Sequence, residues 1–160
     1  MKKILESAYK YILVFILITA NTSVLSEVKL KPFTSGSYSQ IVSIRSKPFI
    51  LIFWSLDCPS CYKELEMLSR FNNRHKKLDI ILVSTDIEAS LEELITILTK
   101  YKLDNIESWV FRGNSDDRLR YEIDAQWYGE LPRSYLFKGK NKKQVISGVL
   151  SEEKLLSWFK

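Results

Sequence analysis

The sequence predicts an α/β fold, a three-layer α/β/α sandwich with a central mixed sheet. Two continuous apolar runs, residues 48–54 and 79–84, are typical of strands that are buried on both faces. Segments with apolar residues at helical spacing follow both runs, at 58–71 and 90–100. Short strands and a closing helix come after Pro132, so we expect parallel strands first and an antiparallel edge later.

Each expected element has its own signal. Residues 28–47 are polar and rich in Ser and Lys, and only short extended pieces such as Gln40 to Ile44 are expected there. Ser90 and Glu93 have the spacing of a capping box, which marks the start of a helix. The remaining expected elements are a strand at 106–111, a short helix at 116–121, strands at 134–137 and 144–150, and a helix at 152–159. No repeat or linker interrupts them, so we expect one domain over residues 28–160.

The first 26 residues form a different kind of sequence. Three Lys residues lie in the first ten positions, and the unbroken apolar run Tyr11–Ile18 is followed by small and polar residues. This pattern predicts a secretory signal peptide, residues 1–26, with cleavage after Ser26 or alternatively after Thr22. The apolar run is short of the roughly 20 residues of a bilayer-spanning helix, so a retained membrane anchor is the second interpretation. Either way we expect a periplasmic or otherwise extracytoplasmic protein.

The charge of the chain is mixed and does not indicate a nucleic-acid partner. The formal net charge is +5, and three Lys and one Glu lie within the first 26 residues. The remainder, with 21 basic and 18 acidic residues, is therefore about +3. Its basic residues are not interleaved with aromatic residues as a nucleic-acid groove requires.

The chain has two cysteines, Cys58 and Cys61. A structural disulfide stabilises most when it closes a long loop, and a pair three residues apart closes almost none. In an oxidising compartment such a pair is better explained as a bond that is made and broken. The sequence therefore indicates a redox pair.

The position of the pair at the start of a predicted helix suits this chemistry. Unpaired backbone N–H groups and the helix dipole favour the thiolate of Cys58, which makes it the expected nucleophile. Cys61 lies one turn deeper on the same face and is the expected resolving thiol. Pro59 suits the first helical turn, where its missing N–H is harmless.

The segment Phe53-Trp54-Ser55-Leu56-Asp57-Cys58-Pro59-Ser60-Cys61-Tyr62-Lys63-Glu64-Leu65 resembles the active-site segment of the TlpA-like branch of bacterial thioredoxin-like proteins. A second segment, Gly129 to Phe137, looks like the loop of that family that carries a cis-proline. The resemblance runs from about Pro32 to Lys160 in element order. It implies a thioredoxin-like fold and an exported or membrane-tethered thiol–disulfide oxidoreductase that needs no bound cofactor.

The resemblance also implies roles for single residues and partners. The Leu131–Pro132 bond would be cis and lie against the cysteines, and Leu131 would offer backbone groups to a substrate strand. Trp54 and Pro59 complete the expected substrate contacts. Glu64 would accept a proton from Cys61, unless it is an ordinary acid favoured by the helix dipole. The implied partners are protein thiols and disulfides, with a membrane electron donor that recharges a reductant.

Three departures from the family pattern leave the direction of electron flow open. Asp57 stands where the family usually has Trp, and its carboxylate opposes thiolate formation unless it caps the helix. Pro59 at the first middle position is shared with strong oxidants and glutaredoxin-type motifs. Ile52 occupies the place of the buried acid of thioredoxin. A periplasmic oxidant or isomerase is therefore an alternative to a reductant.

Interpretations from other classes are weaker. A metal knuckle needs four ligands, and only His75 could join the two cysteines. A peroxiredoxin would have a proline where Leu51 stands, although Ser55 has a suitable offset. A copper-delivery module normally has three residues between its cysteines, and here there are two. An adaptor that uses the fold for binding alone would keep its function without Cys58.

Overall fold

The computed structural model describes residues 29–75, 78–113, 115–139 and 142–159. Within them a six-stranded sheet has the order β1-β4-β3-β2-β5-β6. The elements along the chain are β1 (Leu30–Phe33), α2 (Ser37–Ser43), β2 (Phe49–Trp54), α3 (Pro59–Arg74), β3 (Asp79–Ser84), α4 (Leu91–Lys100), β4 (Glu107–Phe111), α5 (Asp116–Ile123), β5 (Arg133–Phe137), β6 (Lys143–Ser147) and α6 (Glu152–Phe159). Strands β1 to β4 are parallel, and β5 and β6 add an antiparallel edge. The predicted α/β sandwich with a mixed sheet is confirmed.

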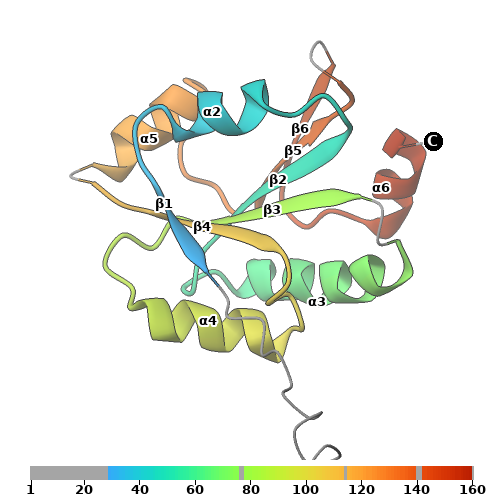
Figure 1. Ribbon diagram of the computed structural model, residues 1–160, viewed down its shortest axis with the longest axis horizontal. Coiled ribbons are helices and arrows are strands. Elements are labelled where there is room, and N and C mark those ends of the chain that lie inside the picture. The colour runs from blue at the N-terminus through green and yellow to red at the C-terminus, as the bar shows by residue number, and fades with distance from the viewer. Residues whose placement is uncertain (1–28, 76–77, 114, 140–141, 160) are drawn as a thin grey trace, which may run out of the picture.

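The helices cover both faces of the sheet (Figure 1). Helices α3, α4 and α6 pack on one face, and α2 and α5 pack on the other. Strand β2 is buried at all six residues because its side chains alternate between the two apolar layers. Ile50, Ile52 and Trp54 point into the first layer, and the other three residues of β2 point into the second. This explains the continuous apolar run in the sequence.

The segment before β2 differs from the expectation. Gln40 to Ile44 is not extended: Gln40 lies in helix α2, and Ile44 is the C-terminal cap of that helix. Tyr38, Ile41 and Val42 have the spacing of one helical face, and Ile41 is buried in the core. The polar residues between them obscured this spacing in the sequence. Strand β1, which the sequence did not reveal, forms the edge of the sheet beside β4.

The later elements follow the prediction closely. Helix α4 begins with the expected capping box, in which Ser90 and Glu93 exchange hydrogen bonds. Strand β6 ends at Ser147, three residues earlier than expected, where Gly148 adopts a φ of 88° that favours glycine. The predicted signal peptide, residues 1–26, lies outside the described residues. In the part of the chain that the structure describes, no helix is long and apolar enough to cross a membrane.

Candidate redox site

The two cysteines lie where β2 passes into α3. Cys58 is the N-terminal cap of α3, one position earlier than the first helical turn, and Pro59 is the first helical residue. A disulfide joins Cys58 to Cys61, with their Cα atoms 5.2 Å apart. Cys58 is 9% exposed and Cys61 is fully buried, so Cys58 is the more accessible of the two cysteines.

A backbone N–H of the helix and a serine hydroxyl lie close to the sulfur of Cys58. The backbone N–H of Cys61 donates to Cys58 Sγ at 3.1 Å, and Ser60 Oγ lies 3.3 Å from the same sulfur. The Cys61 N–H and the N-terminus of α3 favour a negative charge on Cys58 Sγ. Asp57 is exposed and does not cap the helix, because Cys58 itself occupies the cap position.

A carboxylate that the sequence analysis missed holds the loop in front of the cysteines. Asp86 accepts hydrogen bonds from Ser55 Oγ at 2.6 Å, from the Leu56 N–H at 3.0 Å and from Ser84 Oγ at 2.7 Å. Strands β2 and β3 are parallel neighbours, so the loops after them meet at one edge of the sheet. An acid just after the second buried run was therefore a detectable signal. Asp86 fixes the backbone that leads into Cys58.

The loop before β5 lies beside the cysteine motif. The Leu131–Pro132 bond is cis, as the resemblance implied. Ser60 Oγ donates to the Leu131 carbonyl at 3.4 Å, which joins this loop to the start of α3. Pro59 is exposed, Leu131 is half-buried and Pro132 is buried. The structure thus brings the cis-proline loop, through Leu131, against Ser60 of the cysteine motif.

Trp54 does not fit the expected role of a substrate contact. It is 2% exposed and packs in the apolar layer that contains both cysteines. Its carbonyl accepts the Thr85 N–H at 2.9 Å, which links the ends of β2 and β3. Trp54 therefore packs in the core behind the cysteines, where a partner protein does not contact it.

Glu64 lies one helical turn beyond Cys61 and is 1% exposed. It belongs to the second turn of α3, so the interpretation of an ordinary first-turn acid is wrong. Its carboxylate accepts hydrogen bonds from Ser134 Oγ at 2.8 Å and from the Leu150 N–H at 3.2 Å. Burial raises the pKa of Glu64 to about 7, although these two hydrogen bonds work to lower it. Glu64 can therefore exchange a proton near neutral pH.

We expect this shift to make the stability of the fold depend on pH. The pKa of Glu64 is higher in the folded chain than the usual 4.5, so the folded state binds more protons between these values. The stabilisation of the folded state by protonated Glu64 is fully present below pH 4.5. It is lost as the pH rises through about 7, which lowers the free energy of unfolding by about 3 kcal/mol in total. Glu64→Gln should remove this pH dependence of stability, because an amide does not titrate. The variant should still fold, because the amide can donate to Ser134 Oγ and accept from the Leu150 N–H.

Urea unfolding of the oxidised chain at pH 4.5 and pH 8 measures this effect. From pH 4.5 to pH 8, the free energy of unfolding of wild type should fall by about 3 kcal/mol more than that of Glu64→Gln. Glu66→Gln, at an exposed position of the same helix, should follow wild type. If wild type and Glu64→Gln differed in their free energy of unfolding by the same amount at both pH values, Glu64 would not titrate in this range.

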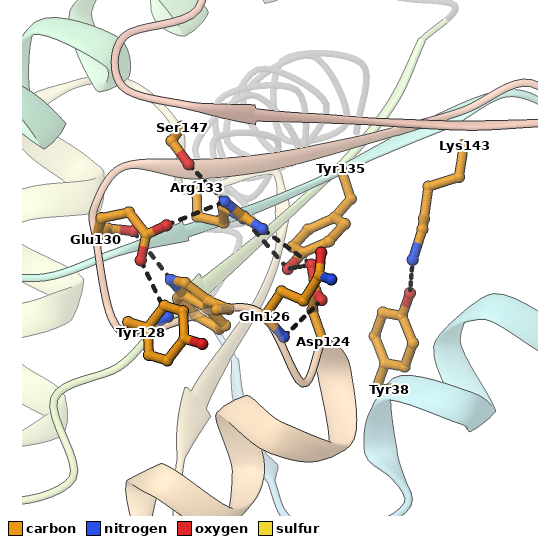
Figure 2. A network of polar contacts seen from close by, with 10 residues as sticks. Tyr38, Asp124, Gln126, Tyr128, Glu130, Arg133, Tyr135, Lys143 and Ser147 are labelled. Atoms are coloured by element: carbon orange, nitrogen blue, oxygen red, sulfur yellow. Dashed lines mark hydrogen bonds and ion pairs between the residues drawn. The ribbon is translucent and has the colours of Figure 1, made fainter.

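Arg133, directly after Pro132, is the centre of a polar network that the sequence did not reveal (Figure 2). Its guanidinium donates to Asp124 Oδ2 at 2.9 Å, to Glu130 Oε1 at 3.3 Å and to the Tyr135 hydroxyl at 3.3 Å. It also donates to Ser147 Oγ on β6. Arg133 is 8% exposed. One side chain thus joins the end of α5, the cis-proline loop and two strands.

The charges of this network are stable around neutral pH. Burial works to raise the pKa of Asp124, but hydrogen bonds from Gln126 and Arg133 and the charge of Arg133 hold it below its usual value. Burial raises the pKa of Tyr135, so its hydroxyl stays protonated and donates to Asp124. The network therefore holds the loop over the physiological pH range.

The residues near the cysteines do not resemble a metal centre. His75, the one histidine of the chain, lies at the far end of α3 against Phe71. Within residues 29–75, 78–113, 115–139 and 142–159, no three His, Cys, Asp or Glu side chains are grouped to hold a metal ion.

Comparisons with known proteins give a fold but no sequence family. No family model and no curated protein sequence matches the chain. Among solved structures, a secreted Mycobacterium tuberculosis disulfide oxidoreductase homologous to E. coli DsbE is 19% identical, with a TM-score of 0.57 over 72% of this chain and 81% of that chain. StoA from Bacillus subtilis is 22% identical, with a TM-score of 0.56 over 72% and 84%. A thioredoxin-related protein from Neisseria meningitidis serogroup B is 21% identical, with a TM-score of 0.57 over 72% and 84%. The chain therefore has the thioredoxin fold, and the neighbours are consistent with the TlpA-like resemblance.

Proposed function

We propose that the chain is a thiol–disulfide oxidoreductase that exchanges disulfides with exported proteins and acts as a reductant. The carrying observation is a disulfide between a partly exposed Cys58 at a helix N-terminus and a fully buried Cys61, next to a cis-proline loop. This arrangement provides one reachable sulfur, one protected resolving thiol and a backbone edge for a substrate strand. Solved structures of the same fold that are named as disulfide oxidoreductases support the proposal.

The reaction needs only the two cysteines and a partner disulfide. The thiolate of Cys58 attacks one sulfur of the partner, and the other partner sulfur leaves as a thiolate and takes up a proton. Cys61 then loses its proton and attacks Cys58 Sγ, which releases the first partner sulfur. The partner gains two electrons and two protons, and the chain is left with the Cys58–Cys61 disulfide. The two-electron balance is therefore complete without a cofactor.

We propose that Glu64 receives the proton of Cys61. It lies on the same face of α3 one turn deeper, and both residues are shielded from bulk water. Burial raises the pKa of Glu64 to about 7, so a fraction of the carboxyl group is ionised at neutral pH. A base whose pKa lies near the working pH is an efficient proton acceptor.

The direction of electron flow follows from the reduction potential of the pair. For a reductant recharged by a membrane donor, we expect a value near or below about −250 mV, because thioredoxin lies near −270 mV. Equilibration of the purified chain against defined thiol buffers measures this value. A potential above about −180 mV would instead indicate an oxidant or isomerase.

A further inference from the structure

The turn between α5 and β5, residues 124–131, is fixed by its own hydrogen bonds. The Gln126 N–H donates to Asp124 Oδ1 at 3.0 Å, and the Trp127 indole N–H donates to the Glu130 carbonyl at 3.0 Å. The Tyr128 N–H donates to Glu130 Oε2 at 3.1 Å. The Arg133 guanidinium donates hydrogen bonds to both Glu130 and Asp124, as Figure 2 shows. The backbone on both sides of Tyr128 is therefore anchored.

Two aromatic neighbours in this turn have opposite environments. Trp127 is 4% exposed and packs against Phe53 in the core, whereas Tyr128 is 91% exposed. Gly129 follows with a φ of 100°, which reverses the chain after the tyrosine. A buried anchor and a tight turn thus present one aromatic ring to solvent on a fixed backbone.

Tyr128 lies in the turn that leads into the cis-proline loop. Three residues after Tyr128, the Leu131 carbonyl lies 3.4 Å from Ser60 Oγ in the cysteine motif. The chain between Tyr128 and Leu131 spans at most about 11 Å, so a partner segment bound along the cis-proline edge is long enough to reach Tyr128. A rigid tyrosine gives contact area at small entropic cost, and tyrosine is enriched among residues that dominate binding.

We propose that Tyr128 is a specificity residue, which contacts an apolar side chain in the partner segment that carries the target disulfide. The proposal rests on the proposed function and adds the chemistry of the partner: an extended segment with an apolar residue near its cysteine. The core of a protein interface is depleted in charge and enriched in aromatic residues, which is the environment that this ring offers. A partner with polar residues beside its cysteine would not bind more tightly because of Tyr128.

The test uses the reduced full chain and two synthetic disulfide peptides. One peptide has Leu and Phe beside its cysteines, and the other has Ser at both positions. We expect wild type to react about tenfold faster with the apolar peptide. Tyr128→Ala should react with both at one rate, and Tyr128→Phe should keep the preference. Oxidised glutathione, which has no apolar side chain beside its cysteines, should react equally with all variants.

Tyr121→Ala is the matched control. Tyr121 is also well exposed, at 70%, but lies on α5 outside the turn, so this variant should keep the wild-type preference. An unchanged preference in Tyr128→Ala, or no preference in wild type, would overturn the assignment of Tyr128 while leaving the oxidoreductase function in place. If folded wild type reacted with neither peptide nor glutathione, the proposed function would fail and this assignment with it.

Discussion

Cys58→Ser should reduce disulfide exchange to the uncatalysed background, whereas Cys61→Ser should attack a partner once and remain bound to it. The difference follows from exposure, since Cys58 is the more accessible cysteine and Cys61 is fully buried. Without Cys58 no accessible thiolate is left to open the partner disulfide. Without Cys61 the mixed disulfide forms, but no second thiol resolves it.

Mass spectrometry of the chain after incubation with a disulfide peptide distinguishes the two variants. Cys61→Ser should gain the mass of one peptide half, and this adduct should disappear when a reductant is added. Cys58→Ser should show no adduct. An adduct on Cys61 in the Cys58→Ser variant would reverse the assigned order of attack, and turnover by Cys58→Ser would rule out the redox pair as the working group.

Arg133→Met should lower the free energy of unfolding by about 3 kcal/mol or more. The substitution keeps much of the side-chain volume but leaves Asp124, whose side chain is 20% exposed, without the cation that balances it. Glu130, Ser147 and the Tyr135 hydroxyl lose a donor at the same time. Removing one partner of a largely buried ion pair is costly because the other charge stays behind.

Arg118→Met is the control for this prediction. Arg118 also pairs with an acid, Glu122, but its side chain is 77% exposed, so its loss should change stability by less than about 1 kcal/mol. Thermal and urea unfolding of the oxidised chains give both values. Equal unfolding midpoints for Arg133→Met and Arg118→Met would show that the network in Figure 2 does not hold the loop.

The local signals of the sequence were enough for most of the fold. Strand β2 was visible because an apolar run buried on both faces has no polar alternation, and α4 was visible from its capping box. Helix α2 was missed because it is short and two polar residues separate Tyr38 from Ile41 and Val42. Strand β1 has four residues and gains its place only by pairing with β4, late in the chain.

In the redox site, too, the parts with local sequence signals could be predicted, and the parts that depend on distant residues could not. The cysteine motif and the proline loop are short contiguous segments, so they could be found without a structure. The surroundings of Glu64 could not, because Ser134 and Leu150 are 70 and 86 residues away in sequence. No local signal marks Arg133, and only the fold brings Asp124, Glu130 and Ser147 to its guanidinium. The burial of Trp54 was likewise a property of the packed core.

A single-turnover reaction tests the dithiol–disulfide exchange most directly. The fully reduced chain is mixed with one equivalent of a disulfide peptide, free thiols are alkylated after a short time, and both products are weighed by mass spectrometry. We predict a chain with no alkyl groups, because Cys58 and Cys61 are joined, and a peptide with two. A folded chain that carries two alkyl groups beside an intact peptide disulfide would contradict the oxidoreductase function.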